Sequence, residues 1–158
     1  MKDSIQPAPL HSALSMKPSW LKVKLRTHEP WLQEMKRHVK SQRLSTVCEE
    51  AQCPNLSECW AGGTVTLMLM GDTCTRGCRF CHIKTGNPHG WLDTEEPEKV
   101  AQMVAQGAWD YVVLTVVNRD DLPDAGASHI VKVLEAIRLA APHTRIETLL
   151  PDFNGKVE

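Results

Sequence analysis

The hydrophobic positions of the chain fall into short apolar runs separated by longer amphipathic stretches. Residues 65–70 (VTLMLM) and 111–117 (YVVLTVV) are apolar almost throughout, which is typical of strands buried on both faces of a parallel sheet. Residues 145–150 (RIETLL) predict a third strand. Enough chain separates these runs to hold a helix in each gap, so the pattern predicts parallel strands joined by right-handed crossovers.

Three other segments place apolar residues at helical spacing. In the first, which Pro30 opens, Trp31, Met35 and Val39 share one face, and such a face normally packs on a core. The other two predicted helices lie between the strands, within residues 94–107 and 126–142. The second half of the chain is therefore predicted to be an α/β unit with the order β-α-β-α-β.

Composition narrows the class of protein. The 158 residues include 18 Lys and Arg and 19 Asp and Glu, giving a net charge of −1, with 42% hydrophobic residues. This balance favours a globular protein with no nucleic-acid and no membrane partner. We expect a flexible leader over 1–16, a helical and Cys-rich segment over 17–63, and the α/β core over 64–158. The first residues lack a continuous apolar stretch, which favours a cytoplasmic location.

All six cysteines lie between Cys48 and Cys81. Cys74, Cys78 and Cys81 are separated by three and then two residues and follow the first predicted strand directly. Three thiolates on one short loop can bind three irons of a [4Fe–4S] cube, and the fourth iron is then open to another ligand. The alternative is a zinc site in which His82 supplies a fourth ligand.

Another set of thiols, Cys48, Cys53 and Cys59, precedes the same strand. A second cluster is the simplest use for them, and the alternative is three unrelated buried thiols. Clustered thiols without a secretory signal favour metal binding or redox chemistry over disulfides.

Four further segments stand out: CEEAQCPNLSECW, GDTCTRGCRFC, NRDDLPDAGASH and IETLLPDFNG. Together they resemble the lipoyl synthase family of radical S-adenosylmethionine (SAM) enzymes, and the similarity extends over about residues 17–158. The resemblance implies a partial (β/α) barrel of the radical SAM type, of which about three β/α units are present, preceded by the helical, Cys-rich extension.

The resemblance also implies roles for residues. Cys74, Cys78 and Cys81 would hold the cluster that binds and cleaves SAM, and Phe80 would lie near the adenine, unless it is ordinary loop packing. The auxiliary cluster, consumed as the sulfur donor, would be held by Cys48, Cys53 and Cys59. Expected cofactors are thus two [4Fe–4S] clusters and SAM. Expected partners are an octanoylated lipoyl carrier domain (2-oxoacid dehydrogenase E2 or glycine-cleavage H protein) and an electron donor such as ferredoxin or flavodoxin.

Some features depart from the family pattern. The chain ends at Glu158, about half the family's length, and contains no Arg-Ser-Ser-Ser-Arg motif for a serine ligand, so a truncated enzyme is expected. Val116 and Asn118 stand where a small hydroxyl residue and Asp are expected. The neighbouring charges at 119–121 either contact SAM or substrate, or cap the turn. Besides sulfur insertion, two functions stay open: cluster binding without sulfur insertion, and a non-catalytic metal or electron-transfer module.

Overall fold

The computed structural model describes residue 18 and residues 29–107 and 109–155. The predicted leader over 1–16 lies outside these residues. The elements, in chain order, are α1 (Pro30–Ser41), β1 (Ser45–Thr46), α2 (Val47–Glu50), α3 (Leu56–Ala61), β2 (Thr64–Leu69), β3 (Thr73–Cys74), β4 (Lys84–Thr85), α4 (Glu96–Gly107), β5 (Tyr111–Val116), α5 (Ala127–Ala140), β6 (Arg145–Thr148) and the 3-10 turn η2 (Phe153–Gly155).

The main sheet has four strands in the order β1-β2-β5-β6. The three predicted strands are β2, β5 and β6, and they pair in parallel, with Leu67 beside Leu114 and Leu114 beside Thr148. Parallel pairing and the order strand-helix-strand-helix-strand are therefore confirmed. The two-residue strand β1, antiparallel to β2, was not predicted, because a segment this short carries no periodic signal.

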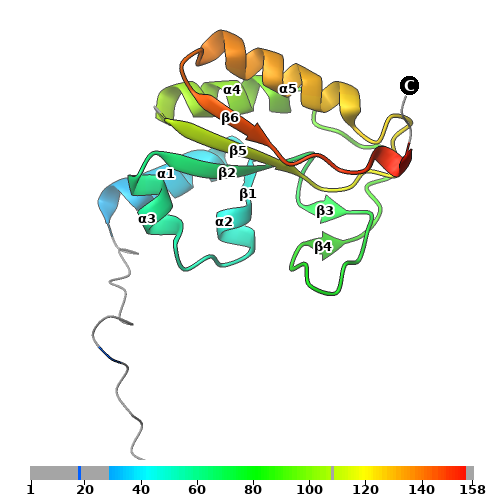
Figure 1. The fold of residues 1–158 in the computed structure, drawn as a ribbon, viewed down its shortest axis with the longest axis horizontal. Helices are drawn as coiled ribbons and strands as arrows, with labels where there is room; N and C mark the ends of the chain where they lie inside the picture. Colours follow the sequence, from blue (N-terminus) through cyan, green and yellow to red (C-terminus); the bar gives the residue numbers. More distant parts are fainter. Residues whose placement is uncertain (1–17, 19–28, 108, 156–158) are drawn as a thin grey trace, which may run out of the picture.

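Helices α4 and α5 pack against each other and cover one face of the sheet (Figure 1). The core between them is built from apolar side chains that alternate inward along the strands or recur at helical spacing. Its fully or almost fully buried members include Val65, Leu67, Leu69, Val100, Met103, Val104, Val112, Leu114, Ile130, Val133 and Ile137. The helices α2 and α3 contact β2, below the sheet in Figure 1.

Helix α1 begins at Pro30, as predicted, because proline fits the first helical position, where no N–H is needed. The predicted apolar face is only partly correct. Val39 is fully buried, but Trp31 and Met35 are only partly buried, and Leu32 is the second buried residue of the helix. The buried stripe thus lies slightly to one side of the predicted one.

The carboxyl ends of β2, β5 and β6 meet at one edge of the sheet, at the right of Figure 1, and β3, β4 and η2 lie at this edge. β3 and β4 form a separate, two-stranded parallel sheet. Open α/β sheets commonly bind ligands beyond the carboxyl ends of their strands. The described residues form an α/β fold around an open sheet with parallel and antiparallel strand pairs. Closure of this sheet into a barrel stays a prediction. No helix in the described part of the chain is long and apolar enough to cross a membrane.

Candidate functional site

The chain leaves β2 through a turn held by buried polar groups. Met70 and Gly71 have φ of 68° and 92°, a left-handed conformation that is unusual for Met. The Met70 N–H donates to both carboxylate oxygens of Glu96 at 3.0 and 2.9 Å, and His129 Nε2 lies 2.6 Å from Glu96 Oε2. Helices α4 and α5 therefore set the direction in which the backbone enters the second cysteine segment, which carries Cys74, Cys78 and Cys81.

Cys74 is the most firmly held thiol of this segment. It lies in β3, and its carbonyl oxygen accepts from Gly86 N at 2.9 Å. Its sulfur accepts from the backbone N–H groups of Arg76 at 3.4 Å and Asn118 at 3.3 Å. Hydrogen bonds to the sulfurs tune the reduction potential of iron–sulfur clusters.

The middle of this loop, residues 77–82, is exposed. Cys78 and Cys81 are exposed and free, and the Cys81 N–H donates to the Cys78 carbonyl at 3.0 Å. Phe80 is 94% exposed, so the structure does not use its ring for packing. An exposed aromatic ring beside free thiols is available to a ligand. His82 is also exposed.

The donor set of this loop fits an iron–sulfur cluster. Three free thiols lie on one short loop, and the sulfur of Cys74 already receives two N–H groups. In such a cluster each thiolate binds a different iron, so the sulfurs need not converge on one point. Over residues 29–107 and 109–155, no three His, Cys, Asp or Glu side chains are gathered so that they could hold one metal ion.

Two of the charged residues after β5, Arg119 and Asp121, form an ion pair, while a contact of residues 119–121 with SAM or substrate stays a prediction. Arg119 is 1% exposed, and its Nε and Nη2 donate to the two carboxylate oxygens of Asp121 at 2.8 Å each. Arg119 Nη2 also donates to the Trp91 carbonyl, and Asp121 accepts from Gly90 N at 2.7 Å. Hydrogen bonds from Arg119 lower the pKa of Asp121 to about 2. This ion pair fastens the segment before α4 to the end of β5.

The first cysteine segment is built on helices. Thr46 caps α2, because its side chain accepts from Glu49 N at 3.2 Å, and Cys48 in this helix is buried. Cys59 lies on α3 and is exposed, and Cys53 lies between the two helices. Desolvation raises the pKa of the Cys59 thiol, and the charges of Cys48 and Cys53 raise it further. The three thiols are therefore within electrostatic reach of one another.

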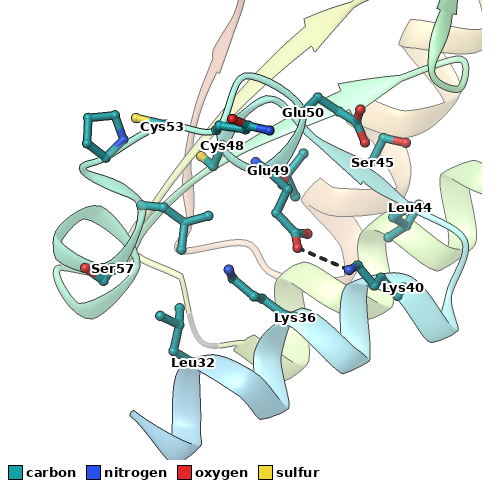
Figure 2. A pocket seen from close by; sticks show the side chains of 14 residues that line it. Leu32, Lys36, Lys40, Leu44, Ser45, Cys48, Glu49, Glu50, Cys53 and Ser57 are labelled. Carbon is teal, nitrogen blue, oxygen red and sulfur yellow. Dashed lines mark hydrogen bonds and ion pairs between the residues drawn. The ribbon is translucent and has the colours of Figure 1, made fainter. Parts of the chain in front are cut away.

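A cavity of about 640 Å³ adjoins two of these thiols. Figure 2 shows Cys48 and Cys53 on one side of this cavity and Lys36 of α1 extending into it from the other side. Lys40, from the same helix, lies 3.8 Å from Glu49. The cavity thus combines two thiols with charges of both signs, because Glu49 and Glu50 line it together with the two lysines.

The sequence indicated the cysteines but not the groups that hold them. Glu96 and His129 carry no spacing signal, since a carboxylate in a first helical turn and a histidine in a helix are common surface features. Thr46 could have been found as a helix cap only if so short a helix had been predicted.

Comparison with known proteins defines the class. A sequence profile described as the Radical SAM superfamily matches residues 68–156, more than half of the 158-residue chain. The match includes Cys74, Cys78 and Cys81, the β3–β4 loop and the strands β5 and β6. The chain belongs to the radical SAM superfamily, and membership implies an iron–sulfur cluster and SAM.

Within this superfamily, the chain is similar to lipoyl synthases. The lipoyl synthase of Legionella pneumophila (strain Corby) is 54% identical over 155 residues, which are 98% of this chain and 47% of that protein. The lipoyl synthase of Francisella philomiragia is 49% identical over 158 residues, 100% of this chain and 48% of that protein. The lipoyl synthase of Deinococcus radiodurans is 55% identical over 139 residues, which are 88% of this chain and 42% of that protein. The chain spans about half the length of the curated relatives it matches.

Proposed function

We propose that this chain carries the cluster-binding and SAM-cleaving part of a lipoyl synthase, which inserts sulfur into an octanoyl chain attached to a carrier protein. The observation that carries the proposal is the 54% identity to lipoyl synthases across 98% of the chain. This identity spans both cysteine segments, whereas the superfamily profile begins only at residue 68. The superfamily match therefore does not include Cys48, Cys53 and Cys59, whereas the similarity to lipoyl synthases does.

The proposed division of labour follows the two cysteine segments. Cys74, Cys78 and Cys81 hold one [4Fe–4S] cluster, and Cys48, Cys53 and Cys59 contribute to a second one. When bound, the cluster on Cys74, Cys78 and Cys81 would supply the electron that cleaves SAM into methionine and a 5′-deoxyadenosyl radical. The cluster of the first cysteine segment would supply sulfur. The boundary that we propose between the two segments, at about residue 64, coincides with the start of β2.

The protein residues bind, orient and shield. Backbone N–H groups of Arg76 and Asn118 donate hydrogen bonds to the Cys74 sulfur and hold it in place. Phe80 presents an exposed ring that would lie near the adenine of SAM. Lys36 places a positive charge in the cavity that Cys48 and Cys53 also line (Figure 2). The proposed partners are an octanoylated lipoyl carrier domain and a ferredoxin or flavodoxin as electron donor, in the cytoplasm.

The test is anaerobic reconstitution of the 158-residue chain with iron and sulfide, followed by dithionite and SAM. Release of 5′-deoxyadenosine is expected, and a lipoyl group is expected on an octanoylated carrier domain. Nucleoside release without a lipoyl group would restrict the function to cluster binding and SAM cleavage. A reconstituted protein that releases no 5′-deoxyadenosine would contradict the proposal.

A further inference from the structure

Two arginines lie on the β3–β4 loop, and their surroundings differ. Arg79 is exposed and makes no hydrogen bond or ion pair with any residue that the structure describes. The Arg76 side chain is only 30% exposed and is surrounded by acceptors. Arg76 lies between Cys74 and Cys78, and Arg79 lies between Cys78 and Cys81. The difference between them arises from the acceptors that face Arg76.

The guanidinium of Arg76 binds two carboxylates, each through two hydrogen bonds. Nε and Nη2 donate to Asp120 at 2.9 Å each, while Nη1 and Nη2 donate to Asp152 at 2.8 and 2.7 Å. Nη2 also donates to Asn154 Oδ1 at 2.7 Å. This fork geometry requires a planar guanidinium, which a lysine cannot replace.

These bonds join three segments that are distant in sequence. Asp120 follows β5, whereas Asp152 and Asn154 follow β6. Thr75 adds a second tie to the end of β5, because its hydroxyl bonds to the Asn118 carbonyl and to Asp120 Oδ2 at 2.9 Å each. The start of the loop is therefore fixed to the carboxyl ends of two strands of the main sheet, as well as to β4.

The charges show what this clasp, formed by Arg76, Asp120 and Asp152, can contribute. One guanidinium between two carboxylates leaves a net charge of 1 − 2 = −1, since hydrogen bonds from Arg76 lower the pKa of Asp120 and of Asp152 to about 2. A net negative group does not attract an anionic iron–sulfur cluster. The contribution of the clasp to a cluster must therefore be geometric.

We propose that Arg76 is a positioning residue, which holds the β3–β4 loop against the ends of β5 and β6 so that its thiols are arranged before a cluster binds. This inference rests on the proposed function. A loop ordered in advance loses less conformational entropy when its thiols bind metal. Groups that orient metal ligands typically contribute about 10–100-fold to metal affinity.

The test compares Arg76→Lys and Asp152→Asn with the control Arg79→Lys, which makes the same substitution three residues further along the same loop. Hydrogen–deuterium exchange of residues 74–86 in the cluster-free protein reports the clasp without any metal. After reconstitution, the rate of iron release to a chelator and the electron paramagnetic resonance (EPR) spectrum of the reduced protein with SAM report the bound cluster.

For Arg76→Lys we expect faster exchange in the loop, at least about tenfold faster iron release, and an altered EPR spectrum with SAM, while Arg79→Lys matches the wild type. If Arg76→Lys does not fold, Asp152→Asn gives the answer, because Asp152 is 63% exposed and its replacement disturbs only one arm of the clasp. Release and exchange rates equal to those of Arg79→Lys would overturn the inference. A wild-type protein that binds no iron would instead refute the proposed function. Hydrogen–deuterium exchange of the cluster-free protein would still show whether the clasp orders the loop.

Discussion

The two cysteine segments present the same number of thiols but are held in place by different forces. The first segment lies on α2 and α3, where Cys48 is buried and Trp60 of α3 is 3% exposed, so hydrophobic packing holds it. The second segment is an exposed loop held by polar ties from Arg76, Thr75 and the β3–β4 pairing. Hydrophobic packing is lost mainly when a large buried side chain is removed, whereas a few hydrogen bonds are lost when a single polar group is replaced. The two segments should therefore respond to different mutations.

The largest effect is expected at Trp60, which supports the first segment. Its ring packs edge-on against Trp109, with 5.8 Å between the centroids. Trp60→Ala leaves a large cavity under α3, and we expect a loss of about 3–5 kcal/mol in the free energy of unfolding. Urea denaturation measures this loss. Trp91→Ala is the matched control, since Trp91 is 67% exposed, and it should change stability by less than about 0.5 kcal/mol.

The next largest effect concerns the entry into the second segment. Glu96→Ala removes the acceptor of the Met70 N–H and the partner of His129, which leaves two buried polar groups unpaired. We expect a loss of about 2–4 kcal/mol, again by urea denaturation. Glu98→Ala, on the exposed side of the same helix, should cost far less. Equal losses for the two variants would show that the buried pair does not hold this turn.

A smaller effect is expected at Thr46, which caps α2 ahead of Cys48. Thr46→Ala removes the acceptor of the Glu49 N–H and should destabilise the protein by about 1 kcal/mol. Thr46→Ser keeps the hydroxyl and should recover most of that loss. A serine variant as unstable as the alanine variant would assign the effect to the lost methyl group and not to the cap.

A further effect, confined to acid pH, is a change in how steeply stability depends on pH. The pKa of Asp121 is about 2 in the folded protein and about 3.9 in an unfolded chain, because Arg119 donates hydrogen bonds to the folded carboxylate. Between these values the unfolded state binds more protons, so this stabilisation is complete above about pH 4 and is lost as the pH falls toward 2. Urea midpoints from pH 2 to 5 should fall less steeply for Asp121→Asn. A slope identical to that of the wild type would contradict this role of the ion pair.

The sequence predicted those features that depend on local patterns. The strands β2, β5 and β6, the helices α1, α4 and α5 and the parallel pairing all follow from apolar runs and helical spacing, and the structure confirms them. The six cysteines were likewise identified from spacing, and their role as cluster ligands stays a prediction. The missed features are non-local. Arg76 and Asp152 lie 76 residues apart, and Glu96 and His129 lie 33 residues apart, so only the folded chain shows that they meet.

The most direct test of two separate cluster sites is the iron content of the oxygen-free, reconstituted chain. A [4Fe–4S] cluster in each segment predicts about eight irons per chain. Replacing Cys74, Cys78 and Cys81 by alanine should remove about four of them, and replacing Cys48, Cys53 and Cys59 should remove the other four. A wild type without iron, or a triple variant that retains the full iron content, would contradict the assignment.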